Sequence, residues 1–268
     1  EAKGDYIIIL NPDTIVESNW IEELISAYNK FGEGLYQPKH LSLNEKTVYM
    51  SAGNMLNIFG FGYAREKGNK DENQFNKIEE ISYASGTCLF TSSAVLKKVG
   101  LFDPFIFLYH DDLDLGWRAS QLGIKSYYVP TSLIYHAESY SLKWNAEKFY
   151  WLERNRKYCI LTHYSKQTYS KIFPTLLAVD FFVWIFYLTK GFLGAKIRAE
   201  LDMIKNRKAI KIKYEELESK KIVSDKELIT KFSDSLHVPS NVTGKNTNSI
   251  FNSVIRRLSK SAKKSLVN

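Results

Sequence analysis

Short apolar runs alternate with segments of helical periodicity along the first 165 residues of this 268-residue chain. The first run, Tyr6–Leu10, lies between turn residues, and its unbroken apolar character is typical of a buried, usually parallel strand. Residues 19–31 then carry apolar side chains at helical spacing, and we expect Ser18 to cap this helix. Further strands are predicted at residues 35–41, within 78–89, at 124–129 and at 133–136. The alternation of strands and helices predicts an α/β sheet.

Three more helices are predicted in the same part of the chain. They cover residues 92–99, residues 111–122 and residues 146–162. Residues 51–75 are rich in glycine and asparagine, which predicts a long loop.

Cysteine content limits the class of protein. The chain has two cysteines, Cys88 and Cys159, and neither stands in a CxxC or Cys/His cluster. This excludes a disulfide-stapled secreted scaffold and a structural zinc site, and it indicates a reducing compartment.

The net charge of +8 is unevenly distributed. Residues 1–189 carry 19 basic and 21 acidic residues, which is not the charge of a nucleic-acid-binding surface, so no nucleic-acid partner is expected. Residues 190–213 carry eight basic and two acidic residues, and residues 235–268 carry six basic and no acidic residues. Positive charge beside an apolar segment suggests an anionic membrane surface as a partner.

Polar residues stand where predicted strands end and where a helix begins. Asp13 follows the first strand, His136 follows the last one, and Asp111, Asp112 and Asp114 fall at a helix start. A carboxylate and an imidazole at the edge of a sheet suit a divalent cation, and a carboxylate at a helix start suits a general base. Each residue also has a structural alternative, because aspartate favours turns and helix caps and a lone histidine is commonly structural. Three carboxylates in four residues are more than capping needs.

Four blocks that contain these residues occur in a characteristic order. They are residues 4–13, residues 84–90 with the Gly-Leu-Phe-Asp segment 100–103, residues 108–118 and residues 128–136. Together they resemble the inverting family 2 glycosyltransferases of the GT-A fold, which belong to enzyme class EC 2.4. The resemblance implies a Rossmann-like α/β fold with a mixed, mostly parallel sheet flanked by helices, to which the C-terminal helices are an extension. Among these, the chain looks most like the rhamnosyltransferase-like members that build bacterial cell-surface polysaccharide. The resemblance covers roughly residues 1–165. One departure is Asn11, which replaces the first aspartate of the family's Asp-x-Asp metal motif.

The resemblance implies a role for each acidic residue. Asp112 would be the catalytic base, with Asp111, Asp114 and Gly86 in support. Asp13 and His136 would hold the divalent cation, Mg²⁺ or Mn²⁺.

The donor diphosphate would be bound by Asp13 together with Arg154 and Arg156. A basic helical face is the alternative explanation for the two arginines. The implied partners are a dTDP- or UDP-sugar donor and a glycan acceptor, which we expect to be lipid-linked. Because enzymes of this family begin with strands that hold the nucleotide, we also expect the first part of the catalytic domain to precede Glu1.

The C-terminal third is predicted to associate with a membrane. The run Leu176–Leu188 is apolar, and Asp180 is the only charge between Lys171 and Lys190. The run is short for a transmembrane span of about 20 residues, which favours a helix in the membrane interface; a core helix is the alternative. Residues 251–266 are predicted to form a basic amphipathic helix after a polar linker at 235–250.

These features divide the chain into three regions. They are a catalytic domain at 1–165, a helical membrane-associated region at 166–234, and a linker with a tail helix at 235–268. We expect an enzyme attached peripherally to the cytoplasmic membrane. Two other functions stay open, a metal-dependent phosphoesterase and a non-catalytic carbohydrate- or membrane-binding fragment.

Overall fold

The computed structural model describes residues 2–137, 145–236 and 245–267, and in the last stretch it describes the side chains of residues 251–266. These residues form two compact units. The sheet unit comprises residues 1–56, 62–105 and 111–140, and the helical unit comprises residues 57–61, 106–110 and 141–268. The helix α4 (Ala146–His163), which we expected in the catalytic domain, groups with the C-terminal helices.

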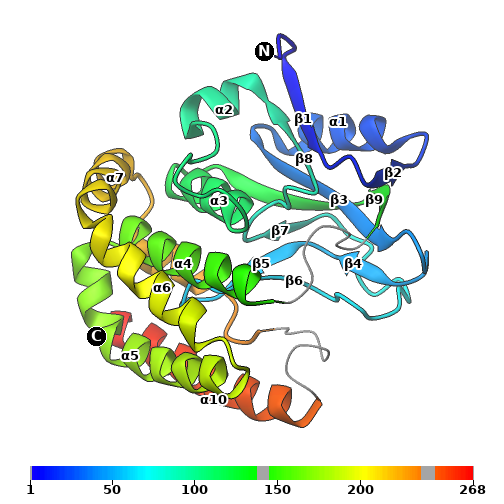
Figure 1. Ribbon diagram of the computed structural model, residues 1–268. Helices are drawn as coiled ribbons and strands as arrows, with labels where there is room; N and C mark the ends of the chain where they lie inside the picture. Colours follow the sequence, from blue (N-terminus) through cyan, green and yellow to red (C-terminus); the bar gives the residue numbers. More distant parts are fainter. Residues whose placement is uncertain (1, 138–144, 237–244, 268) are drawn as a thin grey trace. The chain divides into compact units, whose positions relative to one another are not determined.

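A seven-stranded sheet forms the centre of the sheet unit (Figure 1). Five strands follow the order β1 (Tyr6–Leu10), β8 (Cys88–Ser92), β3 (Gly34–Ser42), β9 (Lys125–His136) and β2 (Thr14–Val16). β4 (Tyr49–Ser51) pairs with β3, and β7 (Glu79–Ile81) pairs with β9. Among the described strands of this sheet only β3 and β9 pair in parallel, and the other pairs are antiparallel. The sheet is mixed as predicted, but the expectation that it is mostly parallel is wrong, because an apolar run indicates that a strand is buried and not which way its neighbour runs.

The first strand shows this most clearly. β1 pairs antiparallel with β8, from Tyr6 opposite Ser92 to Leu10 opposite Cys88. Tyr6 and Leu10 are each 41% exposed, so β1 is not the fully buried parallel strand that its composition suggested. Its apolar residues pack on both faces of the sheet: the Tyr6 ring stacks on Phe90, Ile8 packs against the cluster under α1 (Trp20–Phe31), and Ile9 packs against a second cluster on the opposite face.

Helices cover both faces of the sheet. α1 (Trp20–Phe31) packs Trp20 and Leu24 into one apolar cluster with Tyr36 of β3. The next residue back along β3, Leu35, belongs to a second cluster with Val95 of α2 (Ser93–Val99) and residues of α3 (Asp111–Gln121). Successive residues of a strand point to opposite faces, so one buried strand supplies both cores.

Several local predictions need correction. The N-cap of α1 is Asn19 and not Ser18. The strands predicted at 124–129 and 133–136 are one strand, β9, whose register against β3 shifts where Pro38 pairs with Val129 and Lys39 pairs with Leu133. The region expected as a long loop, residues 51–75, begins at the last residue of β4 and contains a hairpin of β5 (Asn54–Leu56) and β6 (Gly62–Ala64).

The helical unit contains α4 and five further labelled helices. They are α5 (Lys166–Thr189), α6 (Leu193–Lys205), α7 (Arg207–Lys220), α8 (Asp225–Lys231) and α10 (Lys245–Val267). α4 packs against α6 and α7, and α5 packs against α6 and α10.

The tail differs from its prediction. Of the expected linker, residues 237–244 lie outside the described residues, and residues 245–250 already belong to α10. α10 packs on α5 and buries Ile255, Ser259 and Ala262 completely. Part of the apolar face that we predicted for a membrane is therefore occupied by the protein itself.

Candidate active site

The first part of the candidate site follows the end of β1. The Asn11 N–H donates a hydrogen bond of 2.9 Å to the Thr87 carbonyl, and the Thr14 hydroxyl donates one of 2.7 Å to the Asn11 carbonyl. The Asn-Pro-Asp turn is thus closed by its own threonine and held beside the turn at residues 85–87. This arrangement leads the chain from β1 through Asp13 into β2.

Asp13 and His136 lie together. β2 pairs antiparallel with the end of β9, with Thr14 opposite His136, and the Ala137 N–H donates a 3.0 Å hydrogen bond to the Asp13 carbonyl. As a result the Asp13 Oδ1 and His136 Nε2 atoms are 3.3 Å apart, with the side chains 36% and 16% exposed. The sequence placed both residues at strand ends, and the short strand β2 is what brings them side by side.

This pair fits a divalent cation. Two ligands at right angles on one Mg²⁺ ion, each about 2.0–2.1 Å from it, lie about 3 Å apart. A carboxylate oxygen and an imidazole nitrogen are both ligands that Mn²⁺ accepts, and their partial exposure leaves room for ligands from a substrate. The two residues by themselves would leave most of the coordination sphere to substrate and water.

Asp111 and Asp112 begin α3. The Gly86 N–H donates a hydrogen bond of 2.9 Å to Asp112 Oδ2, and the Leu113 N–H donates one of 2.8 Å to Asp112 Oδ1. Burial, and then the like charge of Asp111, raise the pKa of Asp112 to about 7. Burial also raises the pKa of Asp111, and the charge of Asp114 adds to this. A carboxyl group with a pKa near neutrality in hydrogen-bonding surroundings is suited to proton transfer.

Asp114 has a different environment from its neighbours. It is fully buried, and its Oδ2 atom lies 2.7 Å from Nη2 of Arg118 one helical turn away. Arg118 also donates hydrogen bonds of 2.7 and 2.9 Å to the carbonyls of Val99 and Leu101. Through Arg118, Asp114 therefore connects α3 to the end of α2 and to Leu101 beyond it, and it is not placed like a second base.

The turn at residues 85–87 links the two parts of the site. Its Gly86 N–H reaches Asp112, and its Thr87 carbonyl accepts from Asn11 in the segment that leads to Asp13. Gln37 of β3 was not among the predicted site residues. It is fully buried, and its Oε1 atom accepts a 2.9 Å hydrogen bond from the Ser85 N–H. The sequence feature that could have identified Gln37 is a polar glutamine within a predicted strand, residues 35–41.

Two further residues near the site were also missed. A side chain on Gly116 would meet the Cβ atom of Tyr83 at 2.3 Å, so glycine is required for α3 to approach Tyr83. His40 of β3 is buried, and burial followed by the charge of His136 lowers its pKa to about 3. His40 is therefore neutral at physiological pH.

The sequence profile of a family described as "Glycosyltransferase like family 2" matches residues 1–159. The chain belongs to this family. The match covers the acidic cluster, the Asp13–His136 pair and most of α4. It confirms the resemblance drawn from the four sequence blocks.

Two curated relatives are similar to this chain in sequence. A 148-residue match to an N-acetylglucosaminyl-diphospho-decaprenol L-rhamnosyltransferase from Mycobacterium tuberculosis is 26% identical and covers 51% of this chain and 48% of that protein. A 151-residue match to the rhamnosyltransferase WbbL from Escherichia coli is 26% identical and covers 52% of this chain and 54% of that protein. The chain thus spans about half the length of these curated relatives. A solved structure of GalNAc-T7 with UDP, GalNAc and Mn²⁺ has a TM-score of 0.48 at 14% identity, over 65% of this chain and 35% of that one.

Arg154 and Arg156 of this family member are not exposed, contrary to the alternative of a basic helical face. They are 7% and 3% exposed. Arg154 pairs with Asp202 at 3.2 Å, and Arg156 makes two hydrogen bonds, of 2.7 and 2.8 Å, to Glu153 and a third to the Phe59 carbonyl. Burial alone would raise the pKa of Glu153, but the Arg156 guanidinium lowers it to about 2, so both groups are charged. These contacts occupy the guanidinium groups inside the helical unit, which argues against our assignment of both arginines to the donor diphosphate and against an exposed basic face.

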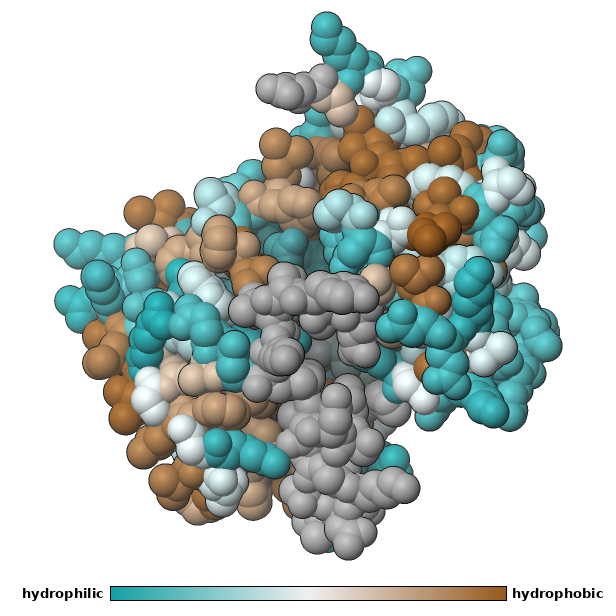
Figure 2. Space-filling view, turned by 45° about the vertical axis from the view of Figure 1, so that its right-hand side comes forward, coloured by the Kyte–Doolittle hydropathy of each residue, from teal (hydrophilic) through white to brown (hydrophobic). Residues whose placement is uncertain are grey.

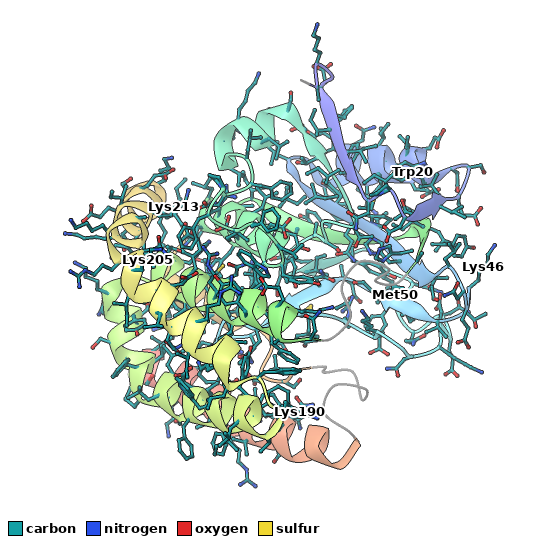
Figure 3. All side chains as sticks on the ribbon, viewed as in Figure 1. Trp20, Lys46, Met50, Lys190, Lys205 and Lys213 are labelled. Atoms are coloured by element: carbon teal, nitrogen blue, oxygen red, sulfur yellow. The ribbon has the colours of Figure 1, made fainter. Side chains whose placement is uncertain are left out.

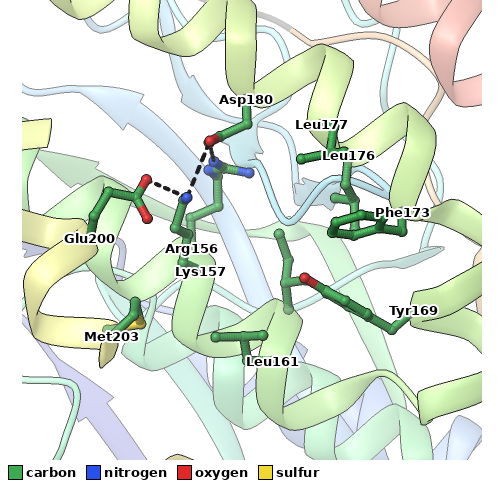
Figure 4. Close-up of a pocket in the computed structure, with 11 residues that line it drawn as sticks. Arg156, Lys157, Leu161, Tyr169, Phe173, Leu176, Leu177, Asp180, Glu200 and Met203 are labelled. Atoms are coloured by element: carbon green, nitrogen blue, oxygen red, sulfur yellow. Dashed lines mark hydrogen bonds and ion pairs between the residues drawn. The ribbon is translucent and has the colours of Figure 1, made fainter. Parts of the chain in front are cut away.

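The helical unit also contains a pocket of about 210 Å³ between α4, α5 and α6 (Figure 4). Apolar side chains such as Phe173 and Leu177 form part of its wall, and charged side chains lie on another part. Asp180 pairs there with Lys196 at 2.7 Å, and Lys157 pairs with Glu200. Because these charges are paired with one another, the pocket offers no free charge to a sugar nucleotide.

Proposed function

We propose that this family 2 glycosyltransferase carries out metal-dependent, inverting transfer of a sugar from a nucleotide-sugar donor to a hydroxyl group of a lipid-linked glycan. One observation carries the proposal. The turn at residues 85–87 joins a carboxylate of pKa about 7, Asp112, to the segment that bears Asp13, and Asp13 lies 3.3 Å from His136 of β9. A base for the acceptor and a cation site for the leaving diphosphate are the two elements that such a transfer needs.

Asp112 accepts the proton of the acceptor hydroxyl as its oxygen attacks the anomeric carbon of the donor. The Gly86 and Leu113 N–H groups stabilise the ionised carboxylate before the reaction, and α3 orients it. Asp13 and His136 would hold the divalent cation, which offsets the negative charge of the departing diphosphate. A single direct displacement of this kind inverts the anomeric configuration.

The sugar and the acceptor are proposed from the relatives. The Mycobacterium protein is named as a rhamnosyltransferase that acts on a decaprenol-linked diphosphate, and the Escherichia coli protein is named as a rhamnosyltransferase. We therefore propose a dTDP- or UDP-linked sugar, with rhamnose as the first candidate, and an acceptor carried on a lipid diphosphate in the synthesis of cell-surface polysaccharide.

We also propose that the protein attaches to the cytoplasmic face of the membrane through α5 and α6. Between Ile172 and Leu188 every exposed residue of α5 is apolar. Six large side chains on this face are 39–62% exposed, namely Phe173, Leu177, Phe181, Phe182, Ile185 and Leu188. α6 adds Ile197, Leu201 and Ile204, which recur at helical spacing and are 43–62% exposed. Figure 2 shows apolar side chains gathered in the region of these helices, at the lower left.

The charges around this face favour an interfacial position. α5 is long and apolar enough to cross a membrane by length and composition, and 22% of its most apolar window is buried. Its one acidic residue, Asp180, pairs with Lys196 inside the helical unit, so the exposed face carries no charge. Lys190 caps the C-terminus of α5, and Lys205 is the last residue of α6 (Figure 3). Each such cation near an anionic surface contributes about 1 kcal/mol. The cytoplasmic side is proposed because Cys88 and Cys159 are both free.

The test of the proposed reaction is an assay of the full-length protein with Mn²⁺ or Mg²⁺, a set of dTDP- and UDP-sugars and a polyprenyl-diphosphate-linked acceptor. We expect acceptor-dependent release of the nucleoside diphosphate and a glycoside of inverted configuration by NMR. Hydrolysis of phosphate esters without sugar transfer would support the phosphoesterase alternative. Binding of the glycan without turnover would support a non-catalytic module.

A further inference from the structure

The chain enters α3 through an unusual turn. Tyr109 and His110 have φ angles of 62° and 65°, the left-handed region that residues with a Cβ atom rarely adopt. Two such residues in succession persist only where surrounding contacts hold them. The turn belongs to the helical unit, and the next residue, Asp111, is the first residue of α3 in the sheet unit.

One face of α4 holds this turn. Lys148, Trp151 and Asn155 are spaced three and four residues apart and so share one side of the helix. The Trp151 ring lies 5.5 Å from the Phe107 ring, and the Lys148 ammonium group lies 5.1 Å from the centre of the Tyr109 ring.

Asn155 makes the directional contacts. It is fully buried, and its Nδ2 group donates hydrogen bonds of 2.7 Å to the Leu108 carbonyl and 2.9 Å to the Tyr109 carbonyl. Its Oδ1 atom accepts a 2.8 Å hydrogen bond from Arg154. An amide has two donor hydrogens, and both are directed to the backbone of the turn. Neither aspartate nor a residue with an apolar side chain can make these two bonds.

His110 completes the turn without carrying charge. Burial lowers its pKa to about 4, although a hydrogen bond with the Gly60 backbone opposes this effect.

We infer that Asn155 is a positioning residue, which holds the Leu108–Tyr109 backbone so that the N-terminus of α3 presents Asp111 and Asp112 in their working geometry. The inference rests on the proposed function, because it assigns Asn155 to the placement of the proposed base. It also assigns a role to the residue between Arg154 and Arg156, the two arginines that we had connected with the donor diphosphate. We call the two hydrogen bonds from Asn155 to the turn the clamp. A small displacement of a catalytic group lowers the reaction rate by a large factor, so loss of the clamp is expected to lower turnover.

The experiment compares Asn155→Asp and Asn155→Ser with Asn57→Ser in the full-length protein. Asn57 is a matched control, because it is also fully buried in the helical unit and donates two hydrogen bonds, to the Ser233 carbonyl and the Ser259 hydroxyl. The values of kcat and KM are calculated from the concentration of folded protein, and the folded fraction of each variant is measured by circular dichroism and thermal unfolding. Backbone amide exchange is followed at residues 108–113.

For the Asn155 variants we expect kcat to fall on the order of 10²-fold while the KM for the donor stays within about twofold. We also expect the acid limb of the pH–rate profile to move to lower pH, because a looser α3 N-terminus admits water to Asp111 and Asp112. A purely structural role would lower stability in the Asn155 and Asn57 variants alike and leave kcat per folded molecule and the pH profile unchanged, which would overturn the inference.

Failure of the proposed function is distinguishable from failure of the clamp. If the unmodified protein transfers no sugar, the proposed function is wrong, and amide exchange then decides the clamp. Faster exchange at residues 108–113 in Asn155→Ser but not in Asn57→Ser would support it. Equal exchange in both variants would refute it.

Discussion

The backbone N–H of Gly86 donates a hydrogen bond of 2.9 Å to Oδ2 of Asp112. The bond favours the ionised carboxylate, whereas burial and the neighbouring charge of Asp111 favour the protonated form. The balance leaves the Asp112 pKa at about 7, where the group is able both to accept a proton and to release it again.

The first prediction concerns the base itself. Asp112→Asn keeps the size of the side chain and removes its basicity, so turnover should fall by at least about 10²-fold with little change in donor binding. In the unmodified enzyme kcat/KM should rise with pH and level off above about 7, where Asp112 is ionised. Steady-state kinetics across pH 5–9 check both points. Near-normal turnover in Asp112→Asn, with loss of activity in Asp111→Asn or Asp114→Asn, would show that the base is misassigned.

The same substitution, Asp112→Asn, should also change the stability of the protein, and the size of the change should depend on pH. Because the folded-state pKa of Asp112 is raised above the unfolded value, ionising it costs the folded protein stability as pH rises from about 4 to about 7. Asp112→Asn should therefore stabilise the protein at pH 8, by about 1–3 kcal/mol, and have little effect at pH 4. We expect less than the free energy that corresponds to the whole rise in the Asp112 pKa, because solvent reaches this partly exposed side chain. Urea unfolding at the two pH values measures this, and an equal effect at both would contradict the origin we give for the shift.

Asp13 and His136 are predicted to share a cation. Asp13→Asn and His136→Gln should each weaken Mn²⁺ binding by at least about tenfold in the presence of a nucleoside diphosphate, because each removes one protein ligand. Asp5→Asn, a change at an exposed carboxylate of the same unit, is the control. Electron paramagnetic resonance of free Mn²⁺ gives the affinities. Unchanged affinity in both variants, or full activity in excess chelator, would exclude this site.

Asp114 is predicted to act on stability and not on chemistry. Asp114→Asn should destabilise the protein by about 3–5 kcal/mol, because it leaves the buried Arg118 without its counter-charge. Replacing both residues in Asp114→Asn/Arg118→Met should recover part of that loss, since no unpaired charge then remains. Denaturant unfolding of the three proteins is the measurement. If Asp114→Asn unfolds like the unmodified protein, the ion pair does not hold α3.

The α5–α6 face is predicted to bind lipid. Leu177→Ser/Phe181→Ser should reduce co-sedimentation with vesicles that contain anionic lipid, and binding by the unmodified protein should weaken at high salt. Ile222→Ser changes a side chain that is 77% exposed elsewhere in the helical unit and should bind normally. Equal binding by all three proteins would reject this face. Self-association that is lost in Leu177→Ser/Phe181→Ser would indicate that a second copy covers the face instead.

Most secondary-structure elements were predictable because their signals are local. The helices over residues 93–99, 111–121 and 146–163 follow from apolar periodicity and from residues that end them. The acidic cluster and Gly86 were recognisable from their order along the chain, although their catalytic roles stay predictions. The loop expected at 51–75 shows the limit, because β5 and β6 pair over too few residues to leave a pattern.

The direction of strand pairing and the surroundings of charged groups were decided by the tertiary structure. An apolar run indicates that a strand is buried, but it does not indicate the direction of the neighbouring strand. β1 runs antiparallel to β8 because of the direction in which the chain returns to the sheet. Residues 154–156 are all polar, which by itself indicates an exposed segment. The packing of α4 buries all three and directs the Asn155 amide to the carbonyls of Leu108 and Tyr109. Local sequence determines which backbone conformation a segment prefers. Which group lies beside a given charge, and so whether that charge serves chemistry or stability, depends on residues far along the chain that only folding brings near.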